Sequence, residues 1–183
     1  MSNLRYKEIL EEINLSLSKS NLSQLEDFIG CILQTRYSIC YGAGRVGLSM
    51  RGFAKRLRHL GLESFYLEDT TVPATNSHDL FIIGSGSGET PTVRAAAQVA
   101  YDRGLNLILI TTNPESSIAQ LSKHVLVIES PSKVGNSQLT SIQPMTTLFE
   151  QSLSILLDSI VLRLMQKVGQ DEESMRVRHN VIE

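Results

Sequence analysis

Apolar residues recur at steps of three and four along the first part of the chain. The recurring positions are Ile9, Ile13, Leu17, Leu22, Leu25, Ile29 and Ile32. This period gathers apolar side chains on one face of an α-helix. Ser20 and Asn21 interrupt the pattern, and both residue types are common at helix N-caps. The pattern predicts two amphipathic helices within residues 1–36, with Ser20 or Asn21 capping the second.

After residue 36 the pattern changes to short apolar runs, bounded by Gly, Asn or Asp, that alternate with helical segments. Such alternation is typical of parallel βαβ units. The expected strands cover residues 38–42, 64–67, 80–84, 105–111 and 125–128. The expected helices between them cover residues 46–60, 92–103 and 116–121. We therefore predict an α/β fold, a three-layer α/β/α sandwich around a five-stranded parallel sheet in the flavodoxin-like order 2-1-3-4-5.

Residues 145–183 predict a long helix, over 146–168, and a polar end that is either a short helix or a tail. An irregular segment rich in Ser, Pro and Gly, 129–143, precedes the helix. The apolar face of this helix is broad for a helix that packs on one side only. This breadth indicates an interface between subunits.

Composition favours one domain across residues 1–183, because 42% apolar residues suffice for a core without disulfides or metal. A net charge of −2 with scattered basic residues argues against a nucleic-acid partner. The spacing of Cys31 and Cys40 fits neither a zinc site nor a redox pair, and Cys40 is expected in the core. No apolar run is long enough to cross a membrane, so we expect a cytoplasmic protein.

Two glycine-rich loops follow the first and third predicted strands. The first reads GAGRVG, residues 42–47, and the second reads SGSGET, residues 85–90. In the predicted strand order these two strands flank the reversal of the sheet, where ligands bind outside the carboxyl ends of strands. We expect both loops to line one crevice.

The first loop has the glycine spacing of a dinucleotide fingerprint, with Gly42, Gly44 and Gly47. Glu68 and Asp69 stand near the end of the second predicted strand, where such an enzyme places an acidic residue against the ribose. The match is weak, but a nicotinamide-dependent enzyme stays open as an alternative.

The second loop favours a phosphate monoester instead. Ser85, Ser87 and Thr90 supply hydroxyls, and Gly86 lets the backbone approach an anion at the N-terminus of a helix. No lysine follows as in a nucleotide P-loop. The alternative is a turn and helix cap without a ligand, in which Glu89 and Thr90 serve only the start of the helix.

The two loops and several further stretches resemble the SIS (sugar isomerase) family of phosphosugar-binding domains, and within it most closely the 6-phospho-3-hexuloisomerase branch. The further stretches are TNP at 112–114 with Ser116, Ser117 and Ala119, FAKRLRHLG at 53–61, Thr71 with PA at 73–74, PMTTLFE at 144–150 and MRVRHN at 175–180. The resemblance covers nearly the whole chain. It implies a single SIS domain, a homotetramer, no metal or organic cofactor, and interconversion of 3-hexulose 6-phosphate and fructose 6-phosphate.

The resemblance also implies roles for single residues. Glu150 is the candidate base. The alternative is a surface glutamate without a catalytic role, because a carboxylate is favourable near a helix N-terminus. His59, about 20 Å along its helix from the first loop, would serve a neighbouring subunit's site, as would His179, although solvated or interfacial histidines are the plain alternative. Gly44 and Arg45 would join the second loop in binding the anion, although Arg45 could instead form a salt bridge at the sheet edge. Val46 stands where the family loop usually has a serine.

The leading prediction is therefore a phosphosugar isomerase that works through an enediol. The alternatives are a non-catalytic sugar-phosphate-binding SIS protein and an isomerase for another ketose or aldose phosphate. A non-catalytic SIS regulator usually carries a DNA-binding domain, and the helices before residue 36 contain no basic recognition helix. This favours the enzyme.

Overall fold

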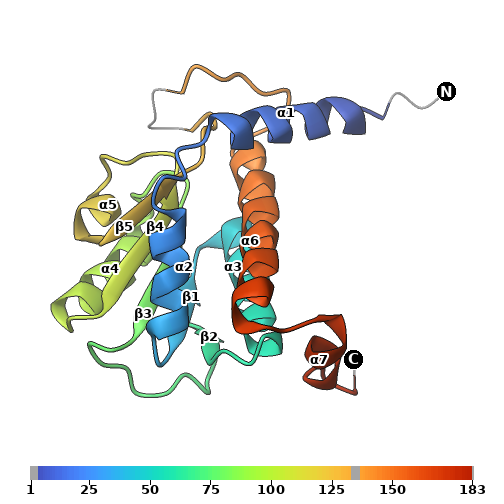
Figure 1. Cartoon of the computed structure of the whole chain (residues 1–183). Coiled ribbons are helices and arrows are strands. Elements are labelled where there is room, and N and C mark those ends of the chain that lie inside the picture. Colours follow the sequence, from blue (N-terminus) through green and yellow to red (C-terminus); the bar gives the residue numbers. More distant parts are fainter. Residues whose placement is uncertain (1–3, 133–136, 183) are drawn as a thin grey trace.

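A computed structural model describes residues 4–132 and 137–182 and contains the predicted five-stranded parallel sheet. The strands are β1 (Ser38–Tyr41), β2 (Ser64–Tyr66), β3 (Leu80–Gly84), β4 (Asn106–Thr111) and β5 (His124–Val127). Their order is β2-β1-β3-β4-β5, and every neighbouring pair is parallel. The flavodoxin-like order predicted above is confirmed, with the β1 and β3 ends adjacent at its reversal (Figure 1).

Helices cover both faces of the sheet and complete the three layers. One face carries α2 (Leu25–Gln34), α3 (Gly44–His59) and α6 (Thr147–Val168), and the other carries α4 (Pro91–Asp102) and α5 (Ser117–Leu121). The central strands β1 and β3 are buried along their whole length because helices cover the sheet on both sides. Cys40 lies in this core as predicted, and burial raises the pKa of its thiol to about 12.

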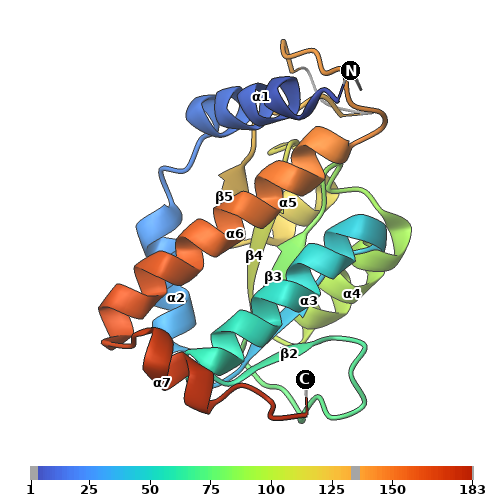
Figure 2. The same ribbon diagram turned by 90° about the vertical axis from the view of Figure 1, so that its right-hand side faces the viewer.

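The helices α3 and α6 run side by side, with their N-termini at the same end of the molecule (Figure 2). The N-terminus of α3 follows β1 directly, so the chain enters this helix at the carboxyl edge of the sheet. The hydroxyl groups of Ser49 on α3 and Ser154 on α6 are 2.8 Å apart, so small polar residues join the two helices in this region. The two helix N-termini therefore meet above the ends of β1 and β3.

The first helix, α1 (Tyr6–Lys19), lies across the N-terminal part of α6 and holds the irregular segment before it. Ser16 on α1 is buried and its hydroxyl is 3.1 Å from that of Ser152 on α6. The Glu12 carboxylate accepts hydrogen bonds from the Ser141 hydroxyl and the Ile142 amide, both at 2.7 Å. These contacts fix the segment that leads into α6.

The predicted cap of the second helix is wrong. The helix α2 begins at Leu25, and neither Ser20 nor Asn21 caps it. The backbone of Asn21 instead pairs with Val127, and the Ser20 hydroxyl accepts a hydrogen bond from the Glu129 amide at 3.0 Å. Both residues join the N-terminal helices to the end of β5, a long-range contact that outweighs their local capping preference.

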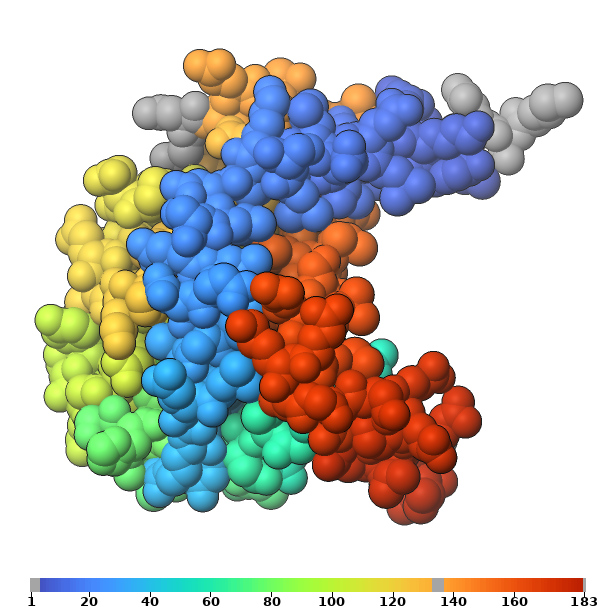
Figure 3. Space-filling model, viewed as in Figure 1, coloured from blue at the N-terminus to red at the C-terminus, as the bar shows by residue number. Residues whose placement is uncertain are grey.

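The long helix α6 ends at Gly169, which has a left-handed φ of 64°. One face of α6 is buried in the core, but Ile155 and Leu162, seven residues apart, are 48% and 62% exposed. The helices α1 and α7 (Glu172–Val177) project on one side of the molecule and leave a hollow between them (Figure 3). Among the described helices, none is long and apolar enough to cross a membrane.

Candidate active site

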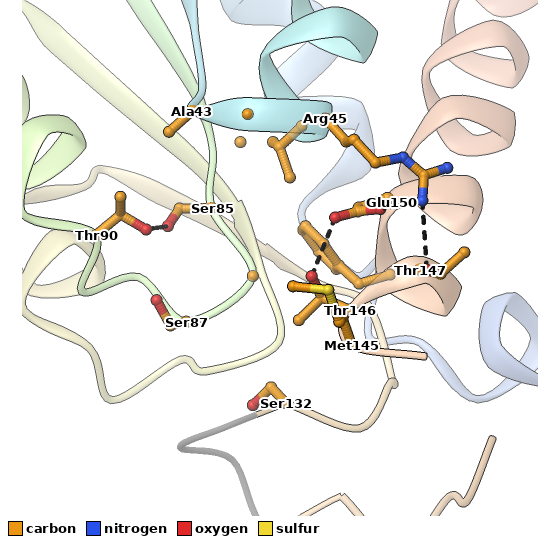
Figure 4. A pocket seen from close by; sticks show the side chains of 15 residues that line it. Ala43, Arg45, Ser85, Ser87, Thr90, Ser132, Met145, Thr146, Thr147 and Glu150 are labelled. Carbon is orange, nitrogen blue, oxygen red and sulfur yellow. Dashed lines mark hydrogen bonds and ion pairs between the residues drawn. The ribbon is translucent and has the colours of Figure 1, made fainter. Parts of the chain in front are cut away.

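A cavity of about 460 Å³ lies at the carboxyl ends of β1 and β3, between the N-termini of α3 and α6 (Figure 4). Both glycine-rich loops line it, as the strand order predicted. Every predicted binding residue is in its wall, together with the candidate base. These residues are Gly44, Arg45, Ser85, Gly86, Ser87, Thr90 and Glu150.

The loop at residues 85–90, called the phosphate loop below after the role predicted for it from the sequence, is stabilised by its own hydroxyls. The Ser85 hydroxyl accepts a hydrogen bond from the Gly88 amide at 3.2 Å and lies 3.5 Å from the Thr90 hydroxyl. The Ser87 hydroxyl accepts from the Glu89 amide at 3.1 Å. Thr90 directly precedes α4, whose first residue is Pro91. Hydroxyl groups and a helix N-terminus thus converge on one side of the cavity, an arrangement that suits an anion.

Two glycines of the phosphate loop are required by close packing. Gly88 has a φ of +65°, and a Cβ there would lie 2.0 Å from the Ser116 hydroxyl. A Cβ on Gly86 would lie 3.2 Å from the ring of Phe149, which is buried on α6. The loop therefore follows a path that only glycine permits at residue 88 and that leaves little room at residue 86.

Glu89 has a structural role in this loop. Its carboxylate accepts hydrogen bonds from the Ser117 amide at 2.6 Å and the Ser117 hydroxyl at 2.8 Å. These bonds lower the pKa of Glu89 below its ordinary value. The side chain ties the phosphate loop to the N-terminus of α5, and it also lies 3.7 Å from the Arg94 guanidinium in the first turn of α4, so it contacts both helices.

Glu150 stands in the first turn of α6 and only 14% of its side chain is exposed. One carboxylate oxygen accepts a hydrogen bond from the Thr146 hydroxyl at 3.1 Å, and the other lies 3.0 Å from the Arg45 guanidinium. The Arg45 side chain is 59% exposed and also donates to the Thr147 hydroxyl at 3.3 Å. Arg45 thus forms a salt bridge, but with the candidate base instead of the sheet edge, and its guanidinium extends toward Glu150 and Thr147 at the start of α6 (Figure 4).

Val46 forms an apolar part of the same wall. It is 9% exposed, and its Cγ1 atom would lie 2.9 Å from a Cβ placed on either Gly42 or Gly84. The valine therefore packs directly on the glycine backbone at the ends of β1 and β3. The hydroxyl that the family resemblance implies at this position is replaced by two methyl groups.

The two candidate histidines lie together, but far from Glu150 of their own chain. The rings of His59 and His179 have centroids 5.3 Å apart and line a second cavity, of about 680 Å³, with Arg56. His59 ends α3, a helix of 16 residues whose first residue, Gly44, lines the first cavity, so His59 lies about 22 Å along the helix from that end. Service to a neighbouring subunit stays a prediction.

The acidic pair considered for a nicotinamide enzyme is engaged elsewhere. The Arg51 guanidinium lies 3.1 Å from the Glu68 carboxylate and 3.2 Å from that of Asp69, and neither acid lines the cavity. A Cβ on Gly47 would lie 2.6 Å from the Gly42 carbonyl oxygen. The glycine spacing of the first loop is therefore explained by the close approach of α3 to β1, without a dinucleotide.

Several cavity residues, Phe149 among them, were not predicted from the sequence as site residues. Thr146 lies four residues before Glu150, a spacing that brings two side chains together at a helix start and could have indicated the pair. Met145 has a φ of +57° and is 84% exposed at the rim. Ser132 and Thr147 come from the irregular segment and the start of α6, where no periodic pattern marks them.

A known protein family and several known proteins are similar to this chain over most of its length. The family model described as SIS domain matches residues 39–155. The 3-hexulose-6-phosphate isomerase of Bacillus subtilis (strain 168) is 36% identical over 178 residues, which are 96% of this chain and 96% of the relative. The enzyme of the same name from Mycobacterium gastri is 32% identical over 96% of this chain and 88% of the relative.

A solved structure is similar over the same extent. It is a protein of Methanococcus jannaschii whose structure was reported to infer a molecular function of 3-hexulose-6-phosphate isomerase. It superposes with a TM-score of 0.85 and 28% sequence identity, over 97% of this chain and 99% of that chain.

Proposed function

The chain belongs to the SIS domain family, and from this premise we propose that it is a phosphosugar isomerase that interconverts 3-hexulose 6-phosphate and fructose 6-phosphate. The observation that carries the proposal is the single cavity in which the phosphate loop faces Glu150. An anion-binding loop and a carboxylate on opposite walls of one cavity suit a phosphorylated substrate that gives up a proton beside a carbonyl.

The reaction moves a carbonyl between two neighbouring carbons. A base takes the proton from C2 of the 3-hexulose while O3 gains a proton, which gives an enediol across C2 and C3. The O2 hydroxyl then loses its proton as C3 gains one, which leaves the carbonyl at C2. The substrate is oxidised at one carbon and reduced at the next, so the reaction needs no external electron acceptor. Glu150 is the proposed base, because it is the carboxylate in the cavity wall and is held in place by Thr146.

We assign the phosphate group to the loop that contains Ser85, Ser87 and Thr90. Gly44 supports the opposite wall, where its φ of +58° lets the first loop turn into α3. Arg45 neutralises part of the substrate charge and stays close to Glu150. Anchoring the phosphate at one end leaves C2 and C3 of a six-carbon chain to reach the other wall.

We also propose a homotetramer in which His59 and His179 of one subunit complete the cavity of another. The apolar side chains of Ile155 and Leu162, which are exposed on α6, support an interface along this helix. A cytoplasmic location follows from the class of reaction, since sugar phosphates are intracellular metabolites. Size-exclusion chromatography would show about 80 kDa for four chains of 20.3 kDa.

The direct test is formation of fructose 6-phosphate from 3-hexulose 6-phosphate, coupled to an indicator dehydrogenase. Glu150→Gln should reduce kcat by about 100- to 10,000-fold, because general-base catalysis is lost. Glu11→Gln, an exposed carboxylate on α1, is the matched control and should keep the parent rate. A Glu150→Gln enzyme as fast as the parent would refute the proposed base, and an inactive parent that still binds fructose 6-phosphate would favour a sugar-phosphate sensor.

A further inference from the structure

Two threonines at the end of β4 hold the phosphate loop from the side away from the cavity. The Gly86 carbonyl oxygen accepts hydrogen bonds from the Thr111 hydroxyl at 3.0 Å, the Thr112 hydroxyl at 2.8 Å and the Thr112 amide at 3.0 Å. A carbonyl oxygen has two lone pairs, so three donors saturate it. Gly86 lines the cavity and neither threonine does. This carbonyl is therefore directed out of the site.

The direction of the carbonyl determines the direction of the next amide. A trans peptide is planar, so the amide hydrogen of Ser87 lies opposite the Gly86 carbonyl oxygen. No cis peptide occurs among the described residues. Within residues 4–132 and 137–182, neither the Gly86 nor the Ser87 amide donates to a protein acceptor. Because the Gly86 carbonyl points away from the cavity, the Ser87 amide hydrogen points toward it.

The same segment of β4 fixes the loop at a second point. The Asn113 side-chain amide donates to the Ser87 carbonyl oxygen at 3.3 Å. The Asn113 backbone amide donates to the Thr111 hydroxyl at 3.1 Å, so this buried hydroxyl accepts one bond and donates another. The Thr111 hydroxyl is thus held in the orientation in which it donates to Gly86.

We propose that Thr111 and Thr112 are positioning residues that aim the Ser87 amide at the substrate phosphate. The inference rests on the proposed function, because it assigns the phosphate to this loop. Neither threonine touches the substrate. Their hydroxyls act through one peptide group, whose rotation would turn the amide away and bring a carbonyl oxygen toward the anion. A phosphate dianion would be repelled by that oxygen, so the two threonines both direct a hydrogen-bond donor at the phosphate and keep an acceptor away from it.

The test compares Thr112→Val, which removes one of the three donors and keeps the side-chain volume, with Thr112→Ser, which keeps the hydroxyl. Affinity for fructose 6-phosphate is measured by titration calorimetry, and KM and kcat by the coupled assay. We expect Thr112→Val to weaken binding and raise KM by about 5- to 20-fold with kcat within about twofold, because one charge-assisted hydrogen bond is misaligned in ground and transition states alike. Thr112→Ser should restore the parent values.

A control and a second variant separate folding from positioning. Thr75→Val, an exposed threonine outside the cavity, should change nothing. Thr111→Val removes the buried donor, and combined with Thr112→Val it should weaken binding further, beyond about 20-fold, with the circular dichroism of the parent. Unchanged binding in both single valine variants would overturn the inference. A parent that binds no fructose 6-phosphate would instead overturn the proposed function and this inference with it.

Discussion

Replacing Gly88 by alanine is expected to destabilise the protein by about 2–5 kcal/mol and to disable the phosphate loop. Gly88 has a φ of +65°, where an L-residue costs about 1–2 kcal/mol. The new Cβ would also lie 2.0 Å from the hydroxyl and 2.4 Å from the Cβ of Ser116. Relief of that overlap moves the loop or α5 and adds about 1–3 kcal/mol.

Gly169→Ala separates the two contributions. Gly169 has nearly the same φ, +64°, but a Cβ there meets no atom within 4 Å. Both substitutions change the unfolded chain in the same way, so that effect cancels in the comparison. Gly169→Ala should therefore cost only the conformational part, about 1–2 kcal/mol, and leave the affinity for fructose 6-phosphate unchanged.

A double variant then tests the contact itself. Ser116→Gly alone should cost a few tenths of a kcal/mol, since glycine is an acceptable N-cap. With the serine side chain gone, the nearest atom to the Cβ of Gly88→Ala is the Thr111 hydroxyl at an ordinary 3.5 Å. Urea unfolding should show a favourable coupling of about 1–3 kcal/mol between the two substitutions. Equal costs for Gly88→Ala and Gly169→Ala, with no coupling to Ser116, would refute the reasoning.

Three further variants probe the site and the fold. Val46→Ser places a hydroxyl in the cavity wall and should lower KM about 3- to 10-fold, measured by steady-state kinetics; an unchanged or higher KM would contradict a phosphate-facing wall at this position. Arg45→Gln should lower kcat/KM about 10- to 100-fold, with a smaller loss at high salt, and a salt-independent loss would argue against charge attraction. Burial alone would raise the pKa of Asp79, but hydrogen bonds from Arg36 and the Asn76 amide outweigh it and leave that pKa below its ordinary value. The stability that ionised Asp79 contributes is therefore present above the ordinary aspartate pKa of about 4 and is lost as the pH falls through the lower pKa of the folded state. Asp79→Asn should lower the free energy of unfolding in urea by about 2 kcal/mol at pH 7, and this loss should shrink toward pH 3. A loss that does not depend on pH would contradict this.

The sheet and its two loops could be predicted because their signals are local. An apolar run followed by glycines and a helical period marks each βα unit, and the crossover rule then gives parallel strands. The placement of both loops in one cavity followed from strand order alone. The position of the cavity could therefore be predicted from short stretches of sequence.

Contacts between distant segments could not be predicted in this way. The pairing of Arg45 with Glu150 depends on how α3 packs on α6, which no local pattern specifies. The same holds for Ser20 and Asn21, whose capping preference was outweighed by contacts with the end of β5. Local propensities are weak preferences that tertiary contacts override, so a local sequence pattern does not specify the finer chemistry of the site.

The most direct test of the central claim is solvent exchange at a single carbon of fructose 6-phosphate. Incubated in D₂O with the parent enzyme and followed by NMR, the sugar should gain deuterium at C3, because its C3 proton is removed to form the enediol and a deuteron from solvent can return there. Glu150→Gln, with fructose 6-phosphate binding confirmed by calorimetry, should show exchange reduced by about 100-fold or more. Deuterium at C1 instead of C3, or exchange at the parent rate in Glu150→Gln, would contradict the account.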